Sequence, residues 1–109
     1  LDFKAEQGSL VRATGAGRVV SAEYSGAYGN MVEIEHANGV SSRYGHLSAI
    51  SVSVGQAVKI GSIVGRVGST GRSTGPHLHY ETRIEGEAVD PQRFLRAAAQ
   101  IASVGAASR

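Results

Sequence analysis

The 109-residue sequence contains no cysteine, no tryptophan and only two prolines. The lack of cysteine excludes disulfide bonds and thiolate ligands, so any metal site must use nitrogen or oxygen donors. Aromatic residues make up only 6% of the chain and form no apparent cluster. The sequence therefore gives no indication of a surface that stacks on sugar rings.

Long apolar runs and a strong excess of charge are also missing. Gly, Ser, Arg or Glu interrupts each apolar stretch, which predicts no membrane span, and the chain does not start with the basic and apolar regions of a signal peptide. We therefore expect any export signal upstream of Leu1. The net charge of +2 comes from scattered arginines. This pattern predicts no nucleic-acid partner, although it favours contact with an anionic polymer such as cell wall.

Glycine and β-branched residues are abundant instead, which predicts an all-β chain with tight turns. The length fits a single compact domain. We expect a hairpin at Asn38-Gly39, because both residues tolerate the positive φ of a type I′ turn. A helix is expected to begin at Asp90-Pro91 and to reach about Ile101. The strands are predicted at residues 17–24, 31–36, 40–46, 57–60, 63–67 and 77–84.

The most informative motif is His77-Leu78-His79, which follows a glycine-punctuated run from residue 68 to 75. On a strand the two imidazoles project from the same face, about 6.5–7 Å apart along the chain. One could bind a metal while the other takes a proton. Two ordinary surface or core histidines would give the same tripeptide, so the motif alone leaves both interpretations open.

Several other residues are candidates for the same region. Strand alternation places His46 on the face of Tyr44, whereas His36 is expected to have a structural role beside the hairpin. Glu81 shares a strand face with the two histidines of the motif and could orient an imidazole, although a solvated charge is an equal alternative. Ordinary packing is an equal alternative for the tyrosines. The candidate groove-lining or orienting residues are Tyr28, Asn30, Tyr44 and Glu81.

Seven segments follow one another in the order found in a known family: Leu1-Asp2-Phe3, residues 28–36, Tyr44-Gly45-His46-Leu47, residues 54–58, Gly68-Ser69-Thr70-Gly71, residues 73–81 and Val89-Asp90-Pro91. In these segments the chain resembles the lysostaphin and LytM-type zinc metallopeptidases. The resemblance implies a small, largely antiparallel, sandwich-like β-domain of the LytM (duplicated hybrid motif) type with a short C-terminal helix. We expect this domain to cover residues 1–96, truncated at its N-terminus, with the end of the helix and a flexible tail at 97–109.

The resemblance also implies a site for one zinc ion. Asp2 and His79 would be ligands, while His46 and His77 would be the unbound catalytic histidines. A catalytic zinc takes three nitrogen or oxygen ligands and keeps a fourth position open for water. The family's third ligand is a histidine four residues before the aspartate, which falls upstream of Leu1. We expect this chain to bind zinc weakly unless an upstream, tag or neighbouring-chain histidine completes the site.

The resemblance implies a zinc-dependent endopeptidase that hydrolyses peptide cross-links of bacterial peptidoglycan, in the periplasm or outside the cell. We interpret the missing histidine as truncation, because Asp2, His46, His77 and His79 are all present. The alternative is a catalytically inactive domain that binds and regulates a wall amidase or a division or sporulation partner. A carbohydrate-binding β-domain with incidental histidines is a third hypothesis. Fold similarity alone does not separate them.

Overall fold

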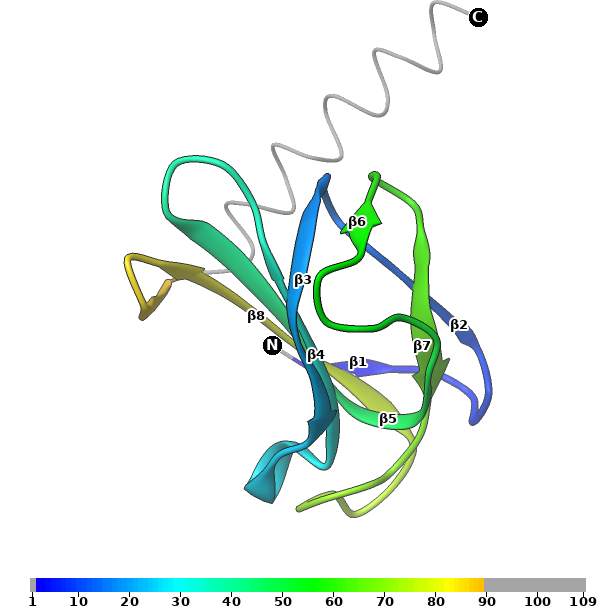
Figure 1. Ribbon diagram of the computed structural model, residues 1–109. Coiled ribbons are helices and arrows are strands. Elements are labelled where there is room, and N and C mark those ends of the chain that lie inside the picture. The colour runs from blue at the N-terminus through cyan, green and yellow to red at the C-terminus, as the bar shows by residue number, and fades with distance from the viewer. Residues whose placement is uncertain (1, 90–109) are drawn as a thin grey trace, which may run out of the picture.

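The computed structural model describes residues 2–89, and within this range nine strands form one sheet in which every pairing is antiparallel (Figure 1). This confirms the predicted fold class. The expected helix from Asp90, the segment 97–109 and the domain end at residue 96 lie outside the described residues. The elements are β1 Asp2–Lys4, β2 Leu10–Arg12, β3 Gly17–Tyr24, the 3₁₀ turn η1 Gly26–Tyr28, β4 Asn30–Glu35, β5 Val40–Ile50, β6 Ala57–Val58, β7 Ile63–Val67, β8 His77–Ile84 and β9 Glu87–Val89.

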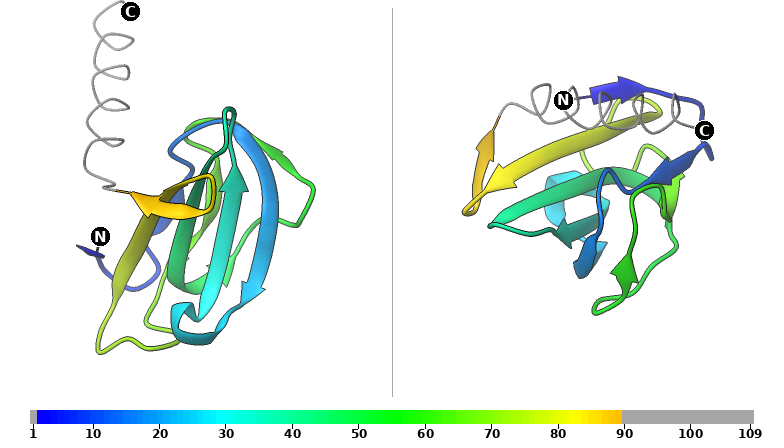
Figure 2. Two further views of the ribbon diagram at one scale, coloured as in Figure 1. Left: turned by 90° about the vertical axis from the view of Figure 1, so that its left-hand side faces the viewer. Right: turned by 90° about the horizontal axis from the view of Figure 1, so that it is seen from above.

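The sheet follows the order β1-β8-β5-β4-β3-β6, with β9 on β8 and with β7 joining β2 to β5. In Figure 1, β8 crosses behind β3 and β4 from lower right to upper left, and β2 and β7 lie to their right. The views in Figure 2 show that the sheet curves strongly instead of lying in one plane. No helix among residues 2–89 is long and apolar enough to cross a membrane.

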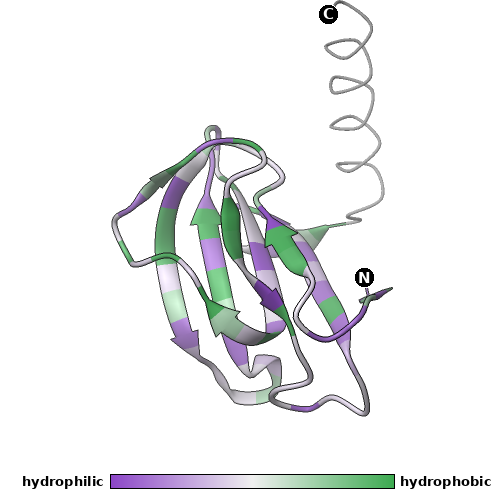
Figure 3. Cartoon of the chain, turned by 90° about the vertical axis from the view of Figure 1, so that its right-hand side faces the viewer, coloured by the Kyte–Doolittle hydropathy of each residue, from purple (hydrophilic) through white to green (hydrophobic). Residues whose placement is uncertain are grey.

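The core is built by alternation along the central strands, and Figure 3 shows hydrophobic and hydrophilic residues alternating along them. Val32 and Ile34 of β4 are fully buried, as the sequence pattern predicts. Tyr44 of β5 and Tyr80 of β8 meet at its centre in a T-shaped contact, with 5.4 Å between ring centroids. Because Tyr80 points into the core, its neighbours His79 and Glu81 project from the other face of β8.

A chain of polar contacts satisfies the phenols inside this core. The Tyr44 hydroxyl accepts a hydrogen bond from the Thr14 backbone N–H at 3.0 Å and lies 2.8 Å from the Ser42 hydroxyl. His36 contacts Ser42 through Nε2 at 2.8 Å and the Ala16 carbonyl through Nδ1 at 2.7 Å. The structural role expected for His36 is therefore confirmed. Tyr44 was expected as a possible groove residue, and this is wrong because its side chain is fully buried.

The β4–β5 hairpin has the predicted geometry, with φ of 62° at Asn38 and 74° at Gly39. Strand β5 continues four residues beyond the predicted end at residue 46, because β7 takes over as its partner. The three-residue strands β1, β2 and β9 were not predicted. Strands this short contain too few residues for alternation to be recognised.

The loop 68–76, between β7 and β8, is fixed against η1 and the start of β4. The Thr70 hydroxyl donates to the Leu47 carbonyl at 2.7 Å and accepts from the Asn30 N–H at 3.1 Å. Two glycines permit this approach, because a Cβ at Gly29 or Gly71 would overlap the backbone facing it. Both glycines also have positive φ, of 67° and 72°. The loop position therefore depends on close backbone contact and on the Thr70 hydroxyl.

We expect Gly71→Ala to lower the free energy of unfolding by about 2 kcal/mol or more, because the added methyl meets backbone and the positive φ is strained. Gly75→Ala is the control in the same loop, since a Cβ at Gly75 meets nothing within 4 Å. Urea unfolding measures both variants. Equal stability of the two would contradict this account of the loop.

Candidate active site

Strand β5 changes its pairing partner partway along its own length. Its first half pairs with β8 as far as Gly45, opposite His79, and its second half pairs with β7 from Leu47 onward. Gly68 and His77 form an isolated bridge where β7 ends and β8 begins. The loop 68–76 therefore lies beside the point at which β5 passes from one partner to the other.

A β-bulge occurs at this same point. From Tyr44 to Leu47 the chain advances three residues, while the facing strand β4 advances only two, from Val32 to Asn30. The extra residue is accommodated at His46, whose φ is 61°. A non-glycine residue rarely adopts this left-handed conformation, and here it reverses the alternation of β5.

The bulge turns His46 toward the histidines of β8. Its ring centroid lies 4.7 Å from that of His77 and 5.8 Å from that of His79. A Cβ on Gly45 would lie 3.5 Å from the Cβ of His79, so Gly45 faces the same side. The prediction that His46 shares a face with Tyr44 was wrong, because it assumed unbroken alternation through the bulge.

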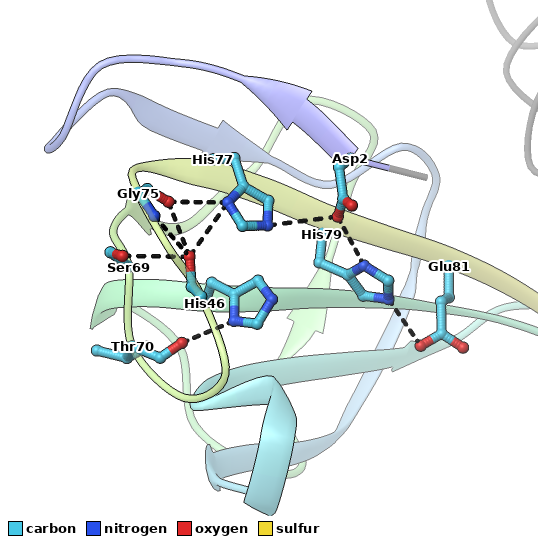
Figure 4. A network of polar contacts seen from close by, with 9 residues as sticks. Asp2, His46, Ser69, Thr70, Gly75, His77, His79 and Glu81 are labelled. Carbon is cyan, nitrogen blue, oxygen red and sulfur yellow. Dashed lines mark hydrogen bonds and ion pairs between the residues drawn. The ribbon is translucent and has the colours of Figure 1, made fainter.

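Strand β1 brings Asp2 to the same place. Asp2 pairs with His79 across the antiparallel ladder. Its Oδ1 lies 2.9 Å from His79 Nδ1 and 3.4 Å from His77 Nε2. The hydrogen bond with His79 lowers the Asp2 pKa against the opposing effect of burial, and the charges of His79 and His77 lower it further. The first described strand thus joins β8 in one cluster (Figure 4).

Glu81 holds the other nitrogen of His79. Its Oε2 lies 3.1 Å from His79 Nε2, and its Oε1 accepts a hydrogen bond from Arg83 at 3.1 Å. Burial acts to raise the Glu81 pKa, but hydrogen bonds from Tyr28 and His79 and the charges of His79 and Arg83 together lower it. His79 thus lies between two carboxylates, Asp2 at Nδ1 and Glu81 at Nε2, and an ionised carboxylate only accepts hydrogen bonds.

When Nε2 donates to Glu81, Nδ1 can face the Asp2 carboxylate only with a second proton or a cation in between. Two acceptors 2.9 Å apart need a proton or a cation between them. An imidazole nitrogen and a carboxylate oxygen are both ligands for zinc. The pair therefore fits a divalent cation, although no group of three or more His, Cys, Asp or Glu side chains among residues 2–89 is arranged to hold a metal.

His46 and His77 each contact a backbone carbonyl through Nδ1 (Figure 4). Nδ1 of His46 lies 2.7 Å from the Thr70 carbonyl, and Nδ1 of His77 lies 2.8 Å from the Gly75 carbonyl. A carbonyl oxygen accepts but does not donate, so each neutral ring carries its proton on Nδ1. Nε2 of neutral His46 is left as an acceptor, whereas Nε2 of His77 lies 3.4 Å from Asp2 Oδ1, a contact that needs a proton or a cation between the two atoms.

These side chains surround a groove of about 520 Å³. Tyr28 forms part of its wall, with its ring 5.7 Å from that of His79 and its hydroxyl accepting a hydrogen bond from Arg43 at 3.3 Å. Asn30 supports the loop indirectly. Its side-chain amide donates to the Leu47 carbonyl, which also accepts from Thr70 of the loop. The full lining is Asp2, Ala27, Tyr28, His46, Arg72, Ser73, Thr74, His77 and His79.

The structure brings together five residues that the sequence singled out, namely Asp2, Tyr28, His46, His77 and His79. Glu81 contacts this cluster through His79. The sequence interpretation missed Ala27, Arg72, Ser73 and Thr74. The glycine-punctuated run before the His-x-His motif was the available signal, because loops that bend close to a site need glycine.

The sequence model described as Peptidase family M23 matches residues 1–91. DD-carboxypeptidase/endopeptidase Mpg of Neisseria meningitidis serogroup B is 54% identical over 91 residues, which cover 84% of this chain and 21% of Mpg. Murein hydrolase activator EnvC of Escherichia coli K12 is 41% identical over 91 residues, which cover 84% of this chain and 22% of EnvC. The chain thus spans about a fifth of the length of these relatives.

Solved structures agree with these matches. The catalytic domain of lysostaphin from Staphylococcus simulans has a TM-score of 0.83 at 39% identity, covering 87% of this chain and 76% of that domain. A zinc-containing peptidase from Vibrio cholerae has a TM-score of 0.79 at 42% identity, covering 82% of this chain and 28% of that chain. These similarities confirm the expected resemblance and its fold.

Glu81→Gln tests the support of His79. A lowered carboxyl pKa stabilises the fold fully above the ordinary value of 4.5, and this stabilisation is lost as the pH falls through the lowered pKa. We expect the variant to be less stable by about 1–2 kcal/mol at pH 7, with a difference that shrinks toward pH 3. Unfolding curves across this range, with chelator present, measure it. The exposed Glu87→Gln is the control, and parallel pH profiles of wild type and Glu81→Gln would contradict the prediction.

Proposed function

The chain belongs to Peptidase family M23, and on this basis we propose that it is a zinc-dependent endopeptidase domain that hydrolyses peptide cross-links of bacterial peptidoglycan. The observation that carries the proposal is the cluster of three histidines with Asp2, in which protein acceptors bind different ring nitrogens. His79 offers Nδ1 beside Asp2, while His46 and His77 offer Nε2 toward the same groove. One set of atoms can hold a cation and the other can move a proton.

The substrate class follows from the relatives. Mpg is named a DD-carboxypeptidase/endopeptidase and shares 54% identity with this chain. We therefore propose that the groove takes peptides containing a bond between two D-centres. Since peptidoglycan lies in the cell envelope, the domain would work in the periplasm or outside the cell.

Asp2 and His79 would hold the zinc ion, with a further ligand from outside residues 2–89. The donor types support this, because a carboxylate and an imidazole face each other at 2.9 Å. When bound, zinc would act as a Lewis acid on the scissile carbonyl and would make water a stronger acid. Glu81 would keep His79 in the ligating tautomer through Nε2.

His77 and His46 would carry the proton transfers. Each has its Nδ1 proton bound to a backbone carbonyl, so Nε2 can take a proton from attacking water and later give one to the leaving amine. The carbonyls also fix the ring orientation. The Arg43-bonded hydroxyl of Tyr28 would border the bound peptide on the opposite wall.

A regulatory role is the second candidate, because the relative EnvC is named a murein hydrolase activator. Such a domain would bind a wall amidase or a division protein through this groove without cleaving peptide. The presence of Asp2, His46, His77 and His79 in one cluster favours the enzyme, since binding a protein does not require that combination of donors.

Peptide cleavage by histidine variants tests the enzyme hypothesis. With zinc supplied, we expect His77→Ala and His46→Ala each to lower kcat/KM by about 100-fold or more, because each removes a proton-transfer group. His36→Ala is the matched control, since His36 lies in the core network. It should lower stability but leave kcat/KM of the folded protein within about twofold. Full activity of both site variants would refute the assignment, and a wild-type chain that binds an amidase but cleaves nothing would favour the regulator.

Zinc binding tests the ligand set. We expect the 109-residue chain to bind zinc weakly, and a histidine three positions upstream of Leu1 to tighten the Kd by about tenfold to hundredfold by adding a ligand. Isothermal titration calorimetry measures both chains. Asp2→Asn should weaken binding in each, whereas His36→Ala should not. Stoichiometric zinc retained after dialysis by the shorter chain, without an outside histidine, would contradict the prediction.

A further inference from the structure

Arg72 is the one permanently cationic side chain among the described residues that line the groove. It follows Gly71 in the loop that carries the carbonyl partners of His46 and His77. A guanidinium stays charged at every physiological pH. The groove therefore has a permanent positive charge in the same lining as the histidines proposed for catalysis.

The backbone of Arg72 is held in place. Its N–H donates to the Ala27 carbonyl at 2.9 Å, which ties the loop to η1. The preceding Gly71 packs so closely on Gly29 that a side chain there would overlap backbone. The guanidinium thus extends from a fixed point, so less conformational freedom is lost when it binds a ligand.

The Arg72 side chain differs from the other arginines within residues 2–89. Each of those others contacts protein oxygen, at either a backbone carbonyl or a carboxylate, whereas the Arg72 guanidinium has no hydrogen bond or ion pair within this range. The others are Arg12, Arg18, Arg43, Arg66 and Arg83.

Within residues 2–89 the acidic residue of the groove, Asp2, forms ion pairs with histidines and none with Arg72. The Asp2 carboxylate is engaged by His79 at 2.9 Å and by His77 at 3.4 Å. Arg72 is thus a planar, five-donor cation without an anion, in a groove that would hold peptide. A carboxylate matches this donor geometry through two parallel hydrogen bonds.

We propose that Arg72 determines substrate specificity by binding a free carboxylate of the peptide close to the scissile bond. The inference rests on the proposed function and adds the chemical class of its substrate, a peptide with an uncapped acid group instead of an amide. The carboxylate can be the C-terminal group or the side-chain acid of a residue beside the bond. Both have the same chemistry, and the experiment separates them.

Three synthetic D,D-linked peptides provide the test: one with all carboxyls free, one amidated at the C-terminus and one amidated at the side-chain acid. Their Kd values are measured by calorimetry on the zinc-supplied His77→Ala chain. We expect one amidation to weaken binding about fivefold or more, and the same amidation to cost less than about twofold when Arg72→Gln is added. In Arg72→Lys the effect of amidation on the Kd should lie between its values with Arg72 and with Arg72→Gln, because lysine keeps the charge but lacks the planar guanidinium that forms two parallel hydrogen bonds.

Lys59→Gln is the matched control, because it removes one exposed positive charge outside the groove and should keep the full preference. Equal binding of all three peptides, an amidation effect of the same size in Arg72→Gln, or no binding of any peptide would overturn the inference.

Cleavage by the chain with His77 intact separates this inference from the proposed function. An Arg72-dependent Kd without cleavage of any peptide would support the carboxylate site and refute the peptidase. Cleavage of free and amidated peptides at equal kcat/KM by wild type would support the peptidase and refute the role of Arg72.

Discussion

The chemistry of the groove depends on which nitrogen of each histidine carries the proton. Backbone carbonyls of Thr70 and Gly75 accept from Nδ1 of His46 and His77, while the Glu81 carboxylate accepts from Nε2 of His79. A carbonyl only accepts, which places the proton of neutral His46 and His77 on Nδ1, whereas His79 lies between two carboxylates and keeps its Nε2 proton when a cation takes the place of the one on Nδ1. Three side chains of the same type thereby acquire two different proposed functions, because different protein atoms bind their ring nitrogens.

These acceptors are held in position by the sheet. Strand β5 changes partner from β8 to β7, and the bulge at this point gives His46 its positive φ and turns it toward the groove. The loop that supplies both carbonyls packs against η1 through glycine backbone. The buried phenols of Tyr44 and Tyr80 fix the opposite face of the same strands. The core packing and the histidine orientation thus depend on opposite faces of the same paired strands.

Local rules predicted much of this arrangement from the sequence. Alternation placed His77 and His79 together, and Asn38-Gly39 indicated its hairpin. The face of His46 was not predictable by alternation, because a bulge is defined by the register of the partner strand. The position of Asp2 beside His79 came from the family resemblance, since a three-residue strand has no period of its own. Arg72 was missed because nothing local distinguishes a groove-lining arginine from a solvated one.

The most direct test of the account is the protonation of the histidine rings. Long-range ¹H–¹⁵N NMR spectra of the ¹⁵N-labelled chain, recorded with excess zinc at a pH where the rings are neutral, identify the protonated nitrogen of each ring. The account predicts protonated Nδ1 in His46 and His77 and protonated Nε2 in His79. Protonation of His46 or His77 mainly on Nε2, or of His79 on Nδ1, would contradict it.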